Sequence, residues 1–343
     1  MRTKAVGKKG DRMKAYVLHG IGDLRYEDVP LPEIPPGWAL VKVLAAGICS
    51  SDIPRIFKRG TYRFPTIPGH EFSGEVEKVT GAEESQWVGK RVGIFPLIPC
   101  KNCPSCQKER YETCSNYDYI GSRRNGGFAE YVAVPVWNLI ELPEAVSDFQ
   151  GALLEPAAVA LHAIKRAKII PGANVCVVGT GAIGLLAGQW AKIQGAGRVV
   201  VKGRNKAKCQ IVQQCRLEYM EDFHVGEEFD CVVEAVGSTK ALEESLLLTA
   251  PGGRVVLMGN PGGPHTLSQD HYWRILRKQL TLTGTWNSSY GSGDWTDAVQ
   301  ALADGELKTA GIITHLLSKN EILKGLEIMR NKSEPVCKII ARL

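Results

Sequence analysis

The N-terminal third of the chain contains short runs in which apolar and polar residues alternate, and proline and glycine separate these runs. Two of them are WALVKVLAAG (38–47) and GEVEKVTG (74–81). Alternation with a period of two is typical of β-strands that bury one face, and the proline and glycine residues between the runs indicate turns. We therefore predict a partly open β-barrel in this part of the chain.

From residue 174 onward the pattern changes to longer apolar blocks. Residues 174–202 combine an apolar strand, a glycine-rich turn, an apolar helix and a second strand rich in valine. Further strand-like and helix-like segments follow at 230–237, 241–250, 253–260 and 277–286. Strands that alternate with helices predict an α/β protein with a mostly parallel, doubly wound sheet.

Length and composition narrow the class of protein. A chain of 343 residues exceeds the usual size of one hydrophobic core, so we expect two domains. No apolar run is long enough to cross a bilayer, and the net charge of +6 is scattered, so neither a membrane nor nucleic acid is an expected partner. Residues 1–12 form a basic extension without the apolar stretch of a secretory signal, which favours a cytoplasmic location. In that reducing compartment, the ten cysteines indicate metal binding or burial rather than disulfides.

Four of the cysteines lie within one short loop: Cys100, Cys103, Cys106 and Cys114. Two C-x-x-C steps share Cys103, and the last cysteine follows after seven more residues, so one excursion of the chain can surround a single ion with four thiolates. Zinc suits such a shell, and four protein ligands leave no open position for a substrate, which predicts a structural site. The alternatives are an iron–sulfur cluster and a thioredoxin-like redox pair.

A second set of candidate ligands is spread along the chain: Cys49, His70, Glu71 and Glu155. Each alone has an ordinary explanation in packing or helix entry. Together they offer sulfur, nitrogen and carboxylate oxygen, a mixed shell typical of a catalytic zinc ion that keeps one position for water or substrate.

The turn in 174–202 contains Gly179, Gly181 and Gly184 in the G-x-G-x-x-G pattern, between a strand and a helix. In this setting the glycines permit a tight turn, a close approach of a pyrophosphate and close contact of helix and strand, so the motif predicts a dinucleotide site. We expect further cofactor contacts from Ile183 and Val236.

The end of the second strand indicates which dinucleotide binds. An NAD site places Asp or Glu there for the ribose 2′-hydroxyl, but this chain has Gly203, followed by Arg204 and Lys206. A carboxylate would repel a 2′-phosphate, whereas a guanidinium can bind one, so we predict NADP(H) over NAD(H). The alternative is that these cations only face solvent, which predicts little preference between the cofactors.

These motifs, in this order, resemble the zinc-dependent medium-chain dehydrogenase/reductase family from Met13 to the C-terminus. The most specific matches are the Cys49 segment, GHE (69–71), the cysteine loop, GGFAEY (126–131) and the glycine motif. The resemblance implies a GroES-like β-barrel catalytic domain with a Rossmann coenzyme domain, one catalytic and one structural zinc ion, and a homodimer or homotetramer. It places the catalytic domain at 13–160 and 287–343 and the coenzyme domain at 161–286.

The resemblance also implies hydride transfer between a secondary alcohol and a carbonyl, with the Ser51 hydroxyl relaying the substrate proton. Pro54 stands where relatives often carry a further relay histidine. The segments 51–60, 117–131 and 277–289 are most similar to the branch that acts on galactitol 1-phosphate and other polyol phosphates. Basic residues that could bind such a phosphate are Arg55, Lys58, Arg59, Arg63, Arg123 and Arg124.

Three alternatives remain at this point. The NADP preference is similar to that of family members that reduce ribulose 5-phosphate, which would favour reduction of a ketose phosphate. A neutral polyol such as sorbitol or L-iditol is the second alternative, although Asn287 and Ser288 replace the Arg-Tyr pair of the sorbitol branch. The third is a zinc-stabilised binding protein without catalysis, which the full set of candidate ligands disfavours.

Overall fold

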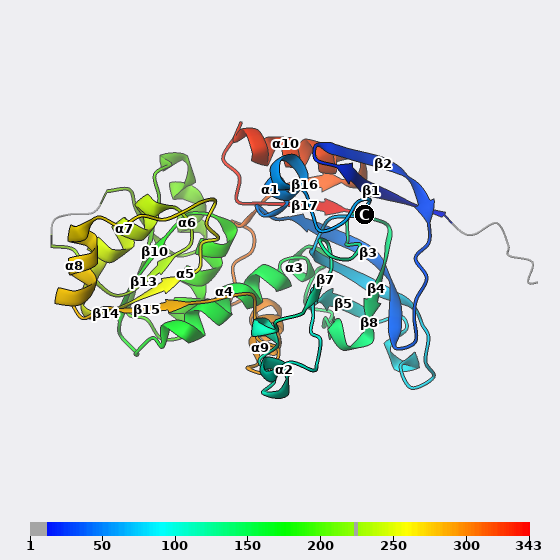
Figure 1. The fold of residues 1–343 in the computed structure, drawn as a ribbon, viewed down its shortest axis with the longest axis horizontal. Coiled ribbons are helices and arrows are strands. Elements are labelled where there is room, and N and C mark those ends of the chain that lie inside the picture. The colour runs from blue at the N-terminus through cyan, green and yellow to red at the C-terminus, as the bar shows by residue number, and fades with distance from the viewer. Residues whose placement is uncertain (1–11, 223–225) are drawn as a thin grey trace, which may run out of the picture.

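The computed structural model describes residues 12–222 and 226–343. Most of the predicted basic extension therefore lies outside the described residues, and the first strand, β1, begins at Arg12. Two separate sheets dominate the molecule, the parallel sheet with its helices on the left of Figure 1 and the barrel-like part on the right. This arrangement confirms the predicted α/β class with a β-barrel part and a doubly wound part.

The larger sheet has seven strands in the order β16-β17-β3-β4-β5-β9, and β8 pairs with residues 38–42 of β3, on the opposite edge of β3 from β4. Its strands are β3 (Trp38–Ile48), β4 (Glu71–Val79), β5 (Arg91–Ile94), β8 (Tyr131–Pro135), β9 (Leu139–Glu141), β16 (Ile313–Ser318) and β17 (Lys338–Arg342). Two small antiparallel pairs flank it: β1 (Arg12–Gly20) with β2 (Asp23–Pro30), and β6 (Leu97–Ile98) with β7 (Asp118–Tyr119). In the first half of β3 the alternate residues Ala39, Val41 and Val43 belong to the buried core, as the sequence pattern predicted, whereas residues 45–48 are all buried.

The second sheet has six strands, all parallel, in the order β12-β11-β10-β13-β14-β15. They are β10 (Asn174–Val178), β11 (Arg198–Lys202), β12 (Glu218–Met220), β13 (Phe229–Glu234), β14 (Thr249–Leu257) and β15 (Thr281–Gly284). The helices that connect them are α5 (Ala182–Ile193), α6 (Cys209–Gln214), α7 (Thr239–Leu248) and α8 (Gln269–Arg277). Valine runs fill the central strands because helices cover both faces of a parallel sheet.

Helix α4 (Leu154–Ala167) connects the two parts and is buried along most of its length. The indole nitrogen of Trp190 on α5 donates a hydrogen bond to the carbonyl oxygen of Ala157 at 2.9 Å, which ties α4 to the parallel sheet. One hydrophobic core includes residues of α4, α5 and both sheets. The predicted domain limits fall within α4 and just after β15, and they stay predictions.

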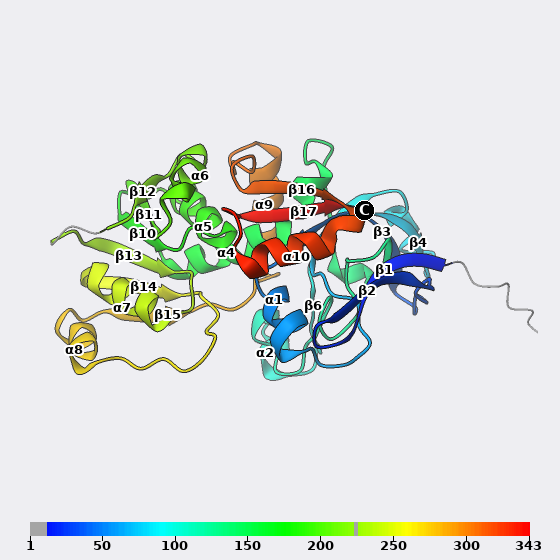
Figure 2. The ribbon, with the colours of Figure 1, turned by 90° about the horizontal axis from the view of Figure 1, so that it is seen from above.

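After the parallel sheet the chain returns to the barrel-like part. Helix α9 (Asp294–Ala303) packs against α4, and α10 (Ile322–Asn331) lies beside β16 and β17 in the view from above (Figure 2). Short helices in loops include α1 (Asp52–Pro54), the π-helical turn η1 (Arg55–Arg59), α2 (Pro104–Gln107) and α3 (Asp148–Gly151). Five 3-10 turns complete the helical segments of the described residues: η2 (Ser85–Trp87), η3 (Tyr111–Thr113), η4 (Val136–Asn138), η5 (Lys206–Lys208) and η6 (Lys319–Glu321). Among the described residues, no helix has both the length and the apolar character needed to span a bilayer.

Candidate active site

A cavity of about 1270 Å³ lies between the two parts of the molecule. One wall carries Cys49, His70 and Glu155, and another carries the glycine turn 179–184 and the loop that follows β11. The segment 332–338, which leads into β17, lines it as well. The cavity thus brings together the two sets of residues that the sequence predicted for metal and for dinucleotide.

Strand pairing places three of the predicted ligands side by side. Cys49 follows the last residue of β3, and Glu71 begins β4 opposite Gly47 of β3. The candidate ligand atoms of Cys49, His70 and Glu71 all lie within 4.8 Å of one another. Because His70 and Glu71 are both buried, this group is a preformed cluster and not a chance grouping at the surface.

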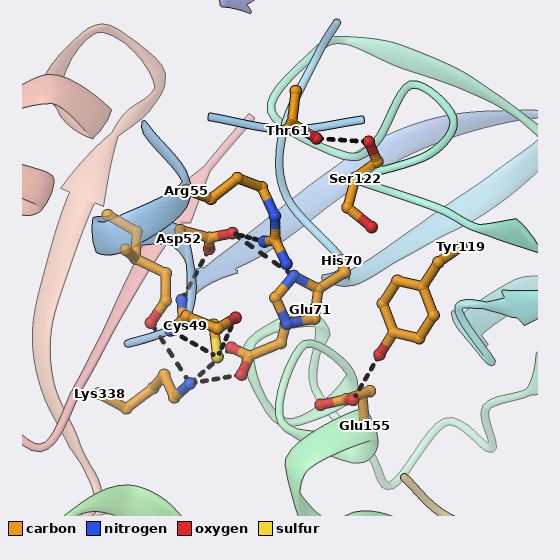
Figure 3. A network of polar contacts seen from close by, with 12 residues as sticks. Cys49, Asp52, Arg55, Thr61, His70, Glu71, Tyr119, Ser122, Glu155 and Lys338 are labelled. Carbon is orange, nitrogen blue, oxygen red and sulfur yellow. Dashed lines mark hydrogen bonds and ion pairs between the residues drawn. The ribbon is translucent and has the colours of Figure 1, made fainter. Parts of the chain in front are cut away.

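Asp52 contacts two members of this cluster, Cys49 and His70. Its carboxylate is fully buried, accepts a hydrogen bond from the Cys49 amide at 3.0 Å and lies 3.5 Å from Nδ1 of His70 (Figure 3). Arg55 donates to the same carboxylate at 3.0 Å. Burial favours a higher pKa for Asp52, but the adjacent His70 and Arg55 outweigh it and lower the pKa. A carboxylate in this position orients an imidazole ring so that its other nitrogen faces the ligand cluster.

Lys338 is a residue of the site that sequence analysis missed. It is the first residue of β17, whose pairing with β3 sets Ile339 opposite Ile48. Its ammonium group lies 2.7 and 2.5 Å from the two carboxylate oxygens of Glu71, and both side chains are buried. Burial alone would lower the pKa of Lys338, but the Glu71 carboxylate raises it, so the ion pair is charged. A separation of 267 residues gives no local sequence signal for this contact.

Glu155 lies in the same cavity but outside the cluster of three. It belongs to the first turn of α4, and its Oε1 accepts a hydrogen bond from the Tyr119 hydroxyl at 3.3 Å. Burial raises the pKa of Glu155 to about 7. Ser51 is closer to the cluster, because its hydroxyl lies 3.3 Å from the sulfur of Cys49. The structure therefore unites Cys49, Ser51, His70 and Glu71, and it holds Glu155 at Tyr119.

The four-cysteine loop forms a separate cluster of sulfur atoms, again within 4.8 Å of one another. Hydrogen bonds from backbone amides lower the pKa of Cys103 to about 5, whereas burial raises that of Cys106 to about 12. The cysteines are free thiols, so the loop carries four sulfur donors and no crosslink. This donor set fits the predicted structural zinc, which stays a prediction.

The glycine turn has the shape that a dinucleotide requires. Gly179 has φ +130°, and a Cβ atom on Gly184 would lie 2.0 Å from the Gly179 carbonyl oxygen, so neither position accepts a larger residue without strain. Gly181 precedes the first residue of α5 and faces open space. The other two predicted contacts, Ile183 and Val236, also line the cavity.

The two predicted cationic residues of the loop after β11 have different surroundings. Arg204 is exposed and lines the cavity, whereas Lys206 does not line it and forms an ion pair of 3.0 Å with Glu221. Lys208, which the sequence analysis did not select, lines the cavity and donates to the carbonyl oxygen of Thr180 at 3.3 Å. A Cβ atom on Gly203 would lie 2.4 Å from the Thr180 methyl group, so the position usual for an acidic residue has no room for one.

The charge of the cavity lining is predominantly positive. The eight cationic residues are Lys58, Arg59, Lys202, Arg204, Lys208, Lys240, Lys332 and Lys338. The four acidic residues are Glu71, Glu155, Glu244 and Glu334. Such a lining favours anionic ligands, and three of the cations flank the loop after β11.

Comparison with known proteins agrees with this geometry. Residues 35–144 match the family model of the alcohol dehydrogenase GroES-like domain, and residues 182–304 match that of zinc-binding dehydrogenase. Galactitol 1-phosphate 5-dehydrogenase of Escherichia coli K12 is 33% identical over 321 residues, which cover 88% of this chain and 92% of the relative. The chain belongs to the zinc-binding alcohol dehydrogenase family. It is an oxidoreductase of that family, as the motifs predicted.

Other relatives of this dehydrogenase extend the comparison. D-xylulose reductase A of Aspergillus clavatus is 30% identical over 330 residues, which cover 90% of each chain. The crystal structure of Escherichia coli galactitol-1-phosphate dehydrogenase has a TM-score of 0.88 at 31% identity and covers 96% of this chain and 100% of its own. A zinc-binding dehydrogenase from Sinorhizobium meliloti, bound to NADP, has a TM-score of 0.89 at 28% identity, with coverages of 97% and 100%.

The residues of the inner cluster fit the zinc ion that the family name implies. They offer one cysteine sulfur, one imidazole nitrogen and one carboxylate within 4.8 Å of one another, and zinc binds this combination of donors. Among the solved relatives, the Sinorhizobium meliloti dehydrogenase is bound to NADP, and an alcohol dehydrogenase of Escherichia coli CFT073, 25% identical with a TM-score of 0.89, is bound to NADH.

Proposed function

We propose that the protein is a zinc-dependent, NADP(H)-preferring dehydrogenase that interconverts a polyol phosphate and the corresponding ketose phosphate. The observation that carries this proposal is a single cavity that contains both the Cys49–His70–Glu71 cluster and a dinucleotide turn followed by an acid-free, cationic loop. The inner zinc would polarise the substrate oxygen, and the nicotinamide would accept or supply the hydride.

The protein residues have distinct parts in this proposal. Cys49 and His70, with a carboxylate of Glu71 or Glu155, would hold the metal, and Asp52 orients His70. Ser51 lies beside the cluster and lines the cavity, so its hydroxyl can pass a proton between substrate and solvent. The four-cysteine loop would hold a second, structural zinc ion away from the cavity.

The cavity lining reduces the number of basic residues that could bind a substrate phosphate. Among the six basic residues selected from the sequence, Lys58 and Arg59 line the cavity. Arg55 is engaged by Asp52, and Arg124 forms an ion pair with Asp118. The remaining two, Arg63 and Arg123, do not belong to the lining. Lys58 and Arg59 therefore support a phosphorylated substrate over a neutral polyol.

Cofactor preference is the first test. We expect the wild type to have a higher kcat/KM with NADPH than with NADH, and Arg204→Ala to reduce that ratio by roughly tenfold or more, because it removes charge-assisted contacts to the 2′-phosphate. Lys206→Ala is the matched comparison from the same loop, and its pairing with Glu221 predicts a smaller change. A wild-type preference for NADH would refute this part of the proposal.

Substrate class is tested with galactitol 1-phosphate, ketose phosphates and unphosphorylated polyols, assayed in both directions. We expect Arg59→Ala to raise KM for the phosphorylated substrates and to leave KM for neutral ones unchanged, with Arg63→Ala, outside the lining, as the control. If the wild type turned over a neutral polyol faster than any phosphorylated substrate, the proposed substrate class would be a neutral polyol and not a polyol phosphate. If the protein bound zinc and cofactor but turned over none of these substrates, the results would favour a binding protein without catalysis.

A further inference from the structure

Tyr119 contacts two of the predicted metal ligands at once. Its ring lies beside the His70 imidazole, with 5.8 Å between ring centroids, and its hydroxyl lies 3.3 Å from Oε1 of Glu155 (Figure 3). In this hydrogen bond the Tyr119 hydroxyl is the donor and the Glu155 carboxylate is the acceptor.

The position of this hydroxyl is fixed by the backbone around it. Tyr119 pairs with Leu97 in the short ladder of β6 and β7. Its carbonyl oxygen accepts hydrogen bonds from the amides of Arg123 and Arg124 at 2.9 and 3.0 Å. Because these hydrogen bonds hold the backbone of Tyr119, its hydroxyl can bind the Glu155 carboxylate at one defined position.

The two carboxylates of the site have unequal partners. Glu71 forms a buried ion pair in which both its oxygens contact the ammonium group of Lys338. Among residues 12–222 and 226–343, the neutral hydroxyl of Tyr119 is the one hydrogen-bond donor to Glu155. A single neutral hydrogen bond holds a carboxylate less strongly than a buried ammonium group does, so Glu155 is the carboxylate that can change its partner at lower cost.

We propose that Tyr119 is a positioning residue that competes with the metal for Glu155. While the Tyr119 hydroxyl holds the Glu155 carboxylate, Cys49, His70 and Glu71 would be left to hold the metal, and a substrate oxygen could reach it. Once released from Tyr119, Glu155 would be available as a further ligand. This inference rests on the proposed function, because it requires a metal ion at Cys49 and His70.

The test measures metal binding directly, without turnover. Zn²⁺ affinity of the inner site is determined by competition with a chromophoric chelator, and the absorption bands of the Co²⁺-substituted protein report the ligand set. Cys49→Ser identifies the signal of the inner site against that of the four-cysteine loop. Tyr119→Phe, Glu155→Gln and the double variant form a thermodynamic cycle.

We expect Tyr119→Phe to tighten Zn²⁺ binding by roughly tenfold, because a hydrogen bond to the competing carboxylate is lost, and to change the Co²⁺ bands. In the Glu155→Gln background the same substitution should change neither. Two outcomes would overturn this inference alone, provided that the wild type binds metal. One is a Zn²⁺ affinity of Tyr119→Phe that is equal to or weaker than that of the wild type. The other is an effect of Tyr119→Phe on Zn²⁺ affinity that persists in the Glu155→Gln background. A wild type without metal at Cys49 and His70 overturns the proposed function as well.

Discussion

The buried carboxylate of Asp294 supports the wall of the cavity, and its removal is the sharpest stability test that the structure offers. The side chain is fully buried at the start of α9. It lies 3.0 Å from Nδ1 of His162 and 3.1 Å from Nζ of Lys165, both on α4, and accepts a hydrogen bond from the Ser289 amide at 2.7 Å. It therefore fixes the segment that follows β15, including the cavity residue Asn287, against the helix that carries Glu155.

Asp294→Ala would leave two buried partners, the Ser289 amide and the His162 ring, without this acceptor, whereas Lys165 keeps its ion pair with Asp297. A buried polar group left without its partner costs about 1–3 kcal/mol, so these two losses together should lower the free energy of unfolding by about 2–6 kcal/mol. For a chain of 343 residues that corresponds to a fall in the melting temperature of roughly 3–8 °C. Scanning calorimetry of the metal-loaded protein measures it, and Asp294→Asn, which keeps the shape of the side chain, should fall between the wild type and the alanine variant.

Asp297→Ala is the matched control. Asp297 lies on the same helix and pairs with the same Lys165 at 2.8 Å, but its side chain is 51% exposed. An exposed pair contributes about 0–1 kcal/mol, so its loss should be nearly silent. Equal destabilisation by Asp294→Ala and Asp297→Ala would refute the argument that burial and not mere pairing sets the cost.

Three further predictions follow from the same structure. Gly184→Ala should lower the melting temperature, because its Cβ would lie 2.0 Å from the Gly179 carbonyl oxygen. Gly181→Ala has open space around its Cβ, so it should fold normally and weaken NADPH binding in a fluorescence titration. Cys106→Ser should release one zinc ion per chain, measured by elemental analysis, and lower stability. The neighbours of Asp294 outweigh burial and lower its pKa, so its contribution is full at neutral pH; the stability gap between wild type and Asp294→Asn should shrink below about pH 4.

The parts of the fold that the sequence predicted well are those set by local pattern. The strand, turn and helix around Gly179–Gly184 form because their apolar periodicity and their glycines leave few alternatives. The predicted ligands Cys49, His70 and Glu71 were recognisable by residue type and by family motif. Their convergence in space needed strand register, because the end of β3 and the start of β4 lie side by side only in the folded sheet.

What the sequence could not show depends on long-range geometry. Lys338 reaches Glu71 only because β17 pairs with β3. Lys206 stays a predicted cofactor contact, but the sequence showed neither its ion pair with Glu221 nor the presence of Lys208 in the cavity lining. Neither contact leaves a periodicity or a motif in the sequence.

The charges around the proposed metal connect these missed residues to the chemistry. Lys338 balances the negative charge of Glu71, so Cys49 would be the one uncompensated anion in the cluster of three. A dication with one thiolate keeps a net positive charge, which favours the substrate in its alkoxide form. A second carboxylate in the shell would cancel that charge. By holding Glu155 aside, Tyr119 would therefore preserve both the open position and the electrostatic attraction that alcohol oxidation requires.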